Sequence, residues 1–235
     1  MVKSLLRSFS VSLVAILAFA AFTSAQTGPA TIAANSNDGA AKTVTAAAVN
    51  NAFLTPTSPS TFENVKIGNF GQVDENYYRG EQPEPDDYKS LADLGIKTII
   101  DLRNDPTDYE KTNAEAVGIK YINIPLSGWK KPKDADIAQF LKVVNDPENG
   151  KLFVHCKGGM HRAGMTTAIY RITKYGWDFD TAYKEMKNYH YFSGLVHGAL
   201  KSYVRDYAKK FEASKARKAN AEKTEAMAVS AGQAN

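Results

Sequence analysis

Cysteine is almost absent from this chain, occurring once among 235 residues, at position 156. A disulfide within the chain is therefore excluded, and the fold must be stabilised by a packed core. Long apolar runs are absent too: the most apolar stretch, Val11 to Phe22, is shorter than the roughly 20 residues that span a bilayer. With 43% apolar and 23% charged residues, the composition predicts one globular domain.

The first 25 residues have the pattern of a signal peptide. Lys3 and Arg7 precede the apolar stretch, and small residues lead up to Ala25, where cleavage is expected. No cysteine follows the stretch, which argues against a lipid anchor. We expect an exported protein, periplasmic or secreted, without stable membrane insertion after cleavage.

Net charge is also small. The formal charge is +4, and without Lys3 and Arg7 the chain has 27 basic against 25 acidic residues. This balance predicts no nucleic-acid partner.

Three parts are expected after the signal peptide. Residues 26–60 are rich in Ala, Thr, Asn and Ser and predict a flexible leader, because they bury too little apolar surface to offset ordering. Residues 61–212 form the expected catalytic domain. Residues 213–235 are rich in Ala, Lys and Glu and predict a disordered or frayed helical tail.

Helical and strand patterns alternate between residues 61 and 212. The expected order is a helix over 84–94, a strand over 98–102, a helix over 109–116, a strand over 119–124 closed by Pro125, a helix over 134–144, a strand over 152–154, and helices over 163–175, 179–189 and 198–211. This alternation predicts an α/β fold with a mainly parallel central sheet flanked by helices. Ligands of such sheets bind at the carboxyl ends of strands.

Cys156 stands at that kind of strand end, in the sequence HCKGGMHRAG of residues 155–164. A Gly-rich turn that enters a helix points backbone N–H groups inward, and the helix end adds partial positive charge. Phosphate fits such a cradle. Arg162 has a planar fork that binds two phosphate oxygens. The same environment favours the thiolate of Cys156, which would be a nucleophile aimed at phosphorus.

The spacing of His155, Cys156, Gly159 and Arg162 resembles the signature loop of the cysteine-based protein tyrosine and dual-specificity phosphatases. Segments 78–83, 99–103 and 124–129 are similar to the bacterial dual-specificity branch. Lys157 and His161 are similar to residues of the plant and fungal atypical branch, some members of which act on inositol pyrophosphates. The resemblance covers most of residues 77–189.

This resemblance implies a phosphate loop between the Cys-bearing strand and the following helix, a phosphocysteine intermediate, and no metal or cofactor. Cys156 would attack phosphorus, Arg162 would hold the phosphate, and His155 would orient the loop from behind. The further phosphate-binding residues that it implies are Lys157, Gly158, Gly159, Met160, His161, Ala163 and Gly164.

The sequence departs from the family pattern at two points. Ala163 stands where the family usually has Ser or Thr, whose hydroxyl supports the departing thiolate. Ser127 and Gly128 stand where the general acid, an Asp, is expected, so the nearest candidates are Asp134 and Asp136. Both acids also suit the first turn of the following helix, and His161 is a further possible proton donor.

Other interpretations fit less well. A nucleotide-binding P-loop would need Lys where Met165 stands. A zinc site from His155, Cys156 and His161 is disfavoured, because neighbours leaving a strand point to opposite faces. A rhodanese-type loop would not require Arg162.

The signature loop does not include Arg79, Arg103, His190 or His197. Arg79 and Arg103 could add charge to the pocket or form structural ion pairs. His190 and His197 belong to no motif, and a structural role is expected.

The expected function is a phosphatase with a phosphorylated substrate as its partner. A phosphoprotein is the first expectation for that substrate. A polyphosphorylated small molecule such as an inositol phosphate is the second. A phospho-binding pseudophosphatase remains open because of Ala163 and the unassigned acid.

Overall fold

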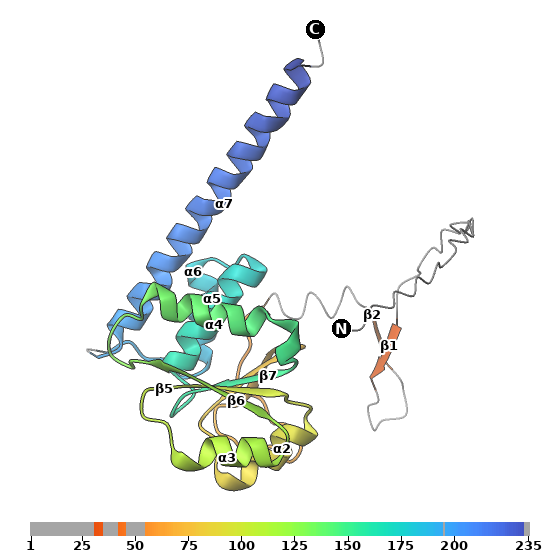
Figure 1. Cartoon of the computed structure of the whole chain (residues 1–235), viewed down its shortest axis with the longest axis vertical. Helices are drawn as coiled ribbons and strands as arrows, with labels where there is room; N and C mark the ends of the chain where they lie inside the picture. Colours follow the sequence, from red (N-terminus) through yellow and green to blue (C-terminus); the bar gives the residue numbers. More distant parts are fainter. Residues whose placement is uncertain (1–30, 35–41, 46–54, 195, 233–235) are drawn as a thin grey trace, which may run out of the picture. The chain divides into compact units, whose positions relative to one another are not determined.

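The first predicted strand forms β5 (Thr98–Arg103), and all its side chains are buried. It pairs in parallel with β6 (Lys120–Leu126) on one side and β7 (Leu152–His155) on the other. β7 also pairs in parallel with β4 (Tyr77–Gly80), which pairs antiparallel with β3 (Gly71–Asp74). The sheet order β3-β4-β7-β5-β6 confirms the predicted mainly parallel sheet (Figure 1). The computed structural model describes residues 31–34, 42–45, 55–194 and 196–232. The expected signal peptide lies outside them.

One face of the sheet is covered by α2 (Tyr88–Asp93), which follows the short 3-10 helix η1 (Pro85–Asp87), and by α3 (Asp108–Ala116). Ile99 and Phe153 point to this side and belong to one hydrophobic cluster. These helices shield this side of β5 and β7 from solvent.

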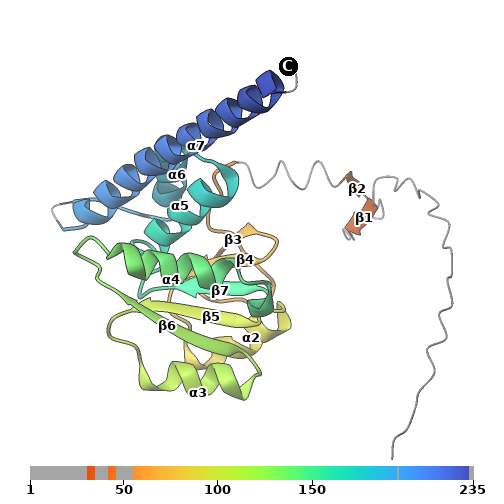
Figure 2. The same cartoon turned by 45° about the horizontal axis from the view of Figure 1, so that its top comes forward.

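Four helices lie on the other face, as Figure 2 shows. They are α4 (Asp134–Asn145), α5 (Arg162–Tyr175), α6 (Phe179–Asn188) and α7 (Gly198–Gly232), with the 3-10 helix η2 (Pro147–Asn149) after α4. Ile100 and Val154, one residue along from Ile99 and Phe153, pack into the larger cluster here. Period-2 alternation between two covered faces explains why the central strands read as unbroken apolar runs.

Strand β6 does not end at Pro125 as predicted but continues to Leu126. β6 is the outermost strand, where a missing backbone N–H is tolerated. The register shifts here, with one extra residue in β6 opposite Asp101 to Arg103. The side-chain amide of Asn123 donates to the carbonyls of Asp101 and Arg103, at 3.0 and 2.9 Å. A side chain therefore supplies hydrogen bonds where the ladder is interrupted.

The segment predicted as a flexible leader contains two short strands. β1 (Thr31–Ala34) pairs antiparallel with β2 (Lys42–Thr45). They belong to a separate unit, residues 1–46.

The ordered domain begins earlier than residue 61. Thr57 donates from its backbone N–H and its hydroxyl to Glu185, at 3.0 and 2.8 Å, and Tyr189 donates to the Ser58 carbonyl. These contacts correct the expected boundary, because Thr57 and Ser58 bind the end of α6.

Helix α7 continues through the segment that was predicted as a tail. Its side chains from residue 212 to residue 227 are exposed. No helix in the described part of the chain is both long and apolar enough to cross a bilayer.

Candidate active site

Strand β7 delivers Cys156 to the carboxyl end of the sheet, between the ends of β4 and β5. The Cys156 side chain is only 3% exposed. Helix α5 begins six residues later at Arg162. The loop between them surrounds Cys156, and both line the same pocket.

The carbonyls of this loop are held from outside. The backbone N–H of Gln82 donates to the Lys157 carbonyl at 3.2 Å, and the Asn69 amide donates to the Gly158 carbonyl at 3.2 Å. The Arg79 guanidinium donates to the Gly159 carbonyl. Three consecutive carbonyls that face outward leave the N–H groups of the loop to face its interior, as an anion cradle requires.

Gly159 is required by two features of the loop. Its φ is +61°, a conformation that side chains disfavour. A Cβ atom would also lie 2.6 Å from the backbone of Gly80. The loop can therefore press against the end of β4 only with glycine at this position.

Arg79 lies beneath the loop. It is fully buried, and its guanidinium stacks 4.0 Å above the Tyr189 ring. Its Nε and Nη1 atoms have no hydrogen-bond partner among the described residues. The sequence left open whether Arg79 lines the pocket, and the structure places it behind the loop instead.

Arg162 is positioned from the opposite side. Its Nη1 donates to the Asn104 side chain at 3.0 Å and to the Leu126 carbonyl at 3.3 Å. The same atom lies 4.0 Å from Asp105 Oδ1. These contacts hold the guanidinium at the pocket wall.

The pocket above Cys156 has a volume of about 680 Å³. Its lining residues are Glu81, Asn104, Asp105, Gly128, Trp129, Cys156, Lys157, Gly158, Met160, His161, Arg162 and His197. Most of the loop residues expected at the site are therefore here. The exceptions are Gly159, which faces Gly80, and Ala163 and Gly164, which are buried in the first turn of α5.

His155 lies behind the loop and is fully buried. Its Nε2 is 3.0 Å from a carboxylate oxygen of Glu110, and its Nδ1 is 3.9 Å from Asp101. This arrangement agrees with an orienting role.

These three residues are also the group in the described part of the chain whose geometry could hold a metal ion. However, Asp101 already accepts from Tyr121 at 2.8 Å and from the Arg103 N–H at 2.8 Å. The other oxygen of Glu110 accepts from Thr107 at 2.9 Å. Burial raises the pKa of the Asp101 carboxyl. We interpret the two carboxyl groups as acidic neighbours that face the His155 ring, with Arg103 3.5 Å from Glu110.

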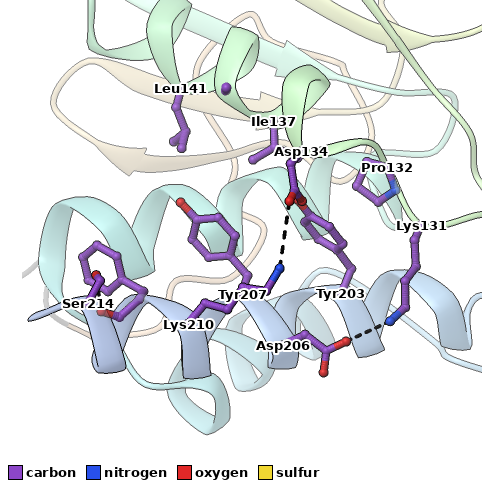
Figure 3. A pocket seen from close by; sticks show the side chains of 12 residues that line it. Lys131, Pro132, Asp134, Ile137, Leu141, Tyr203, Asp206, Tyr207, Lys210 and Ser214 are labelled. Atoms are coloured by element: carbon purple, nitrogen blue, oxygen red, sulfur yellow. Dashed lines mark hydrogen bonds and ion pairs between the residues drawn. The ribbon is translucent and has the colours of Figure 1, made fainter. Parts of the chain in front are cut away.

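Asp134 and Asp136 do not line the pocket that contains Cys156. Asp134 is exposed, accepts from the Tyr203 hydroxyl at 2.8 Å and lies 3.9 Å from Lys210, in a separate hollow between α4 and α7 (Figure 3). Asp136 accepts from the backbone N–H of Lys133 at 3.2 Å. Both residues serve the start of α4, which is the alternative role that the sequence offered.

Three aromatic rings from separate segments form one wall of the pocket. His161 and His197 stack with ring centres 3.5 Å apart, and Trp129 stacks on His197 at 4.7 Å. His197 Nδ1 lies 2.8 Å from the Gly128 carbonyl, and the Tyr191 hydroxyl donates to the His197 carbonyl at 2.6 Å. Burial and the neighbouring His197 lower the pKa of His161 to about 4, so at neutral pH it is an uncharged imidazole.

Sequence reasoning missed the pocket roles of Glu81, Asp105 and His197. Asp105 belongs to no motif, and His197 was expected to have a structural role. Strand register was the available signal, because Asp101 lies beside His155 and the residues after β5 must therefore flank the cysteine loop. Glu81 lies beside the loop because Gly159 approaches the backbone of Gly80 and Glu81 closely.

Comparison with known proteins agrees with this geometry. The family model described as a DSP-PTPase phosphatase fused to NAD+ kinase matches residues 58–227. Inositol diphosphatase DSP4 of Arabidopsis thaliana is 34% identical over 110 residues, 44% of this chain and 54% of that protein. Dual specificity protein phosphatase TpbA of Pseudomonas aeruginosa is 27% identical over 134 residues, 56% of this chain and 60% of that protein. The chain spans about half the length of the curated relatives that it matches.

Solved structures show the same fold. The core catalytic domain of the PP-IP phosphatase SIW14 from S. cerevisiae gives a TM-score of 0.56 at 21% identity, over 66% of this chain and 95% of that one. P. aeruginosa TpbA gives 0.57 at 21% identity, over 68% and 97%. Since the family model matches well over half of the residues, this chain belongs to the DSP-PTPase phosphatase family.

Proposed function

We propose that this protein hydrolyses phosphomonoesters through a phosphocysteine intermediate. The observation that carries the proposal is the placement of Cys156 at the base of a pocket whose wall is the Arg162 guanidinium. A thiolate there meets the phosphorus of a bound phosphate from below, while the loop N–H groups and Arg162 bind its oxygens.

The reaction has two steps. In the first, the Cys156 thiolate forms an S–P bond as the ester P–O bond breaks, and an acid protonates the leaving oxygen. In the second, water attacks phosphorus, the S–P bond breaks, the thiolate is restored and inorganic phosphate leaves. No change of oxidation state occurs.

We assign the acid to Asp105 rather than to Asp134 or Asp136. Asp105 lines the pocket, and its carboxylate lies 4.0 Å from Arg162. In the free protein a hydrogen bond with Arg103 lowers the pKa of Asp105. A bound phosphate dianion raises the pKa of a nearby carboxyl group, so substrate would favour the protonated form that the first step needs. Glu81 is the other carboxyl group of the pocket.

The substrate is a phosphorylated protein or, as the second possibility, a polyphosphorylated small molecule. Relatives of both kinds match this chain, since TpbA is named a protein phosphatase and DSP4 an inositol diphosphatase. The likeness therefore supports phosphatase chemistry and leaves both substrates open.

Hydrolysis of para-nitrophenyl phosphate tests the proposal. The wild-type protein should release para-nitrophenol, vanadate should inhibit, EDTA should not, and Cys156→Ser should abolish turnover. Phosphate binding without turnover would identify a pseudophosphatase, and strict dependence on a divalent ion would contradict the mechanism.

Export remains part of the proposal, supported by the charge and apolar pattern of residues 1–25. Mass spectrometry of the mature N-terminus should find residue 26 first.

A further inference from the structure

Exposed apolar side chains gather beside the pocket. Trp129 is 60% exposed, Phe192 54% and Val196 53%. Trp129 lines the pocket itself, and Val196 precedes the lining residue His197. We call Trp129, Phe192 and Val196 the apolar rim. Clustered exposed apolar residues next to a binding site mark a contact surface, because single ones are common but groups are not.

The rim is held in place by the histidine pair. Phe192 meets the rings of His161 and His197 edge-on, with centres 4.6 and 5.4 Å apart. Trp129 stacks flat on His197, whose Nδ1 lies 2.8 Å from the Gly128 carbonyl. Aromatic rings fixed in this way offer contact area at little entropic cost.

Few cationic side chains line the pocket. They are Lys157 and Arg162, and the acidic lining residues are Glu81 and Asp105. His161 adds no charge at neutral pH, because its pKa is about 4.

Other basic residues nearby do not change this balance. Arg79 donates to the Gly159 carbonyl from behind the loop. Arg103 donates to the Gln82 side chain and to the Asp105 carbonyl. Lys131 is paired with Asp206 at 2.8 Å, and Lys130 is not among the lining residues. Beyond the phosphate loop, the additional phosphates of an inositol ring would meet Glu81 and find no further cationic lining residue.

Resting on the proposed phosphatase function, we infer that the natural substrate is a phosphorylated protein segment in which an apolar residue beside the phosphorylated one packs on the apolar rim. The phosphate enters the loop, and the neighbouring side chain covers Phe192 and Val196. This assignment favours the phosphoprotein over the inositol phosphate by charge and by apolar contact together.

Binding to the Cys156→Ser protein tests the inference without turnover. Two phosphotyrosine peptides that differ only in Leu or Glu beside the phosphotyrosine would be compared by calorimetry. We expect the Leu peptide to bind about tenfold more tightly, the size of effect that burying one aliphatic side chain produces. Phe192→Ser and Val196→Ser, each introduced into the Cys156→Ser protein, should bring the ratio of the two dissociation constants toward one.

The exposed Val117, beyond the end of α3, provides the control. Val117→Ser should leave the tenfold ratio unchanged. The inference would be overturned if the two peptides bound with equal affinity, or if the rim substitutions did not reduce the ratio of their dissociation constants. Tighter binding of an inositol pyrophosphate than of either peptide would also overturn it. A different outcome is that the wild-type protein distinguishes the two peptides and still fails to hydrolyse para-nitrophenyl phosphate. That result would support the role of the apolar rim in peptide binding and contradict only the phosphatase function.

Discussion

At residue scale, Ala163 is the departure from the family pattern with the clearest kinetic consequence. It is fully buried in the first turn of α5, where a hydroxyl would support the departing thiolate. A hydrogen bond to a charged group contributes about 1.5–3 kcal/mol, and each 1.36 kcal/mol is about tenfold in rate. Dephosphorylation should therefore limit turnover. Rapid mixing with an aryl phosphate should give a burst of phenol near one per active site.

Ala163→Ser should raise the steady rate about tenfold or more and leave the burst rate nearly unchanged. Ala168→Ser, on the same helix and equally buried, is the control and should change neither rate. Absence of a burst would mean that formation of the phosphoenzyme is limiting.

Replacement of Asp105 separates the two assignments of the acid. Asp105→Asn should lower kcat/KM for an alkyl phosphate by about 10² or more, the usual size of general-acid catalysis, with less effect on para-nitrophenyl phosphate. Asp134→Asn should have a small effect on both, because Asp134 lies in another hollow. A large loss in Glu81→Gln alone would move the role to Glu81.

Arg79 should control the reactivity of the cysteine through the loop. Arg79→Met removes a buried cation and the donor to the Gly159 carbonyl. Alkylation of Cys156 at neutral pH should become several-fold slower, because the variant removes a buried cation that interacts electrostatically with Cys156. Arg79→Lys should restore part of the rate.

Arg171→Met is the matched control for Arg79. Arg171 is also fully buried, but it forms its ion pair with Glu185 of α6, at 2.8 Å. The variant should lower stability without slowing the alkylation of Cys156. Equal alkylation rates in both variants would assign Arg79 a purely structural role.

The sequence revealed those site residues that share one segment. The spacing of Cys156 and Arg162 is local, so the chemistry could be predicted without the fold. Asp105 and His197 come from distant loops with no motif of their own, and only the pairing of β5 with β7 and the course of the chain after α6 bring them to the pocket. Distance along the chain is why those residues were missed.

At the scale of elements, the stacked histidines join the cysteine loop to the segments before α4 and α7. The unfolded chain binds a proton on His161 near pH 6.5, whereas in the fold its pKa is about 4. Between these values the unfolded state takes up a proton that the folded state does not. Stability should therefore fall as the pH drops from 7 toward 4.

The melting temperature measured at several pH values checks this expectation. His161→Phe keeps a ring in the stack and should make the decline between pH 7 and 5 shallower. His190→Asn is the control, because His190 is exposed in a turn with φ +62°, which Asn tolerates. It should retain the wild-type slope, and an unchanged slope in His161→Phe would contradict the assignment.

Most helices and strands could be predicted because their periodicity is local. Strand β5 is an example, because its short run of apolar residues predicts a strand over 98–102 from the sequence alone. β3 and β4 were not predicted, since each has only four residues and β4 is buried on both faces, which leaves no alternation. Pro125 was read as a stop because the sequence does not show that β6 is an outermost strand with a bulge.

At the scale of the whole domain, Thr57 binds the segment before β3 to helix α6. Thr57→Val removes the hydroxyl that donates to the buried Glu185 carboxylate. Loss of that bond should lower the free energy of unfolding by about 1–3 kcal/mol, as measured with urea. The exposed Thr61 gives the control, and Thr61→Val should change it by less than about 0.5 kcal/mol. Similar values for both would place the domain start nearer residue 61.

The irregular strand β6 also affects how readily two copies of the protein associate through the edge of the sheet. An outermost strand with a free row of N–H groups is a template on which a second molecule can add a strand and begin aggregation. In β6 the exposed Pro125 has no N–H to offer, and the bulge beside it bends the strand away from a regular ladder. The interruption, at which Asn123 supplies hydrogen bonds to β5, thus leaves this edge of the sheet unsuited to intermolecular pairing.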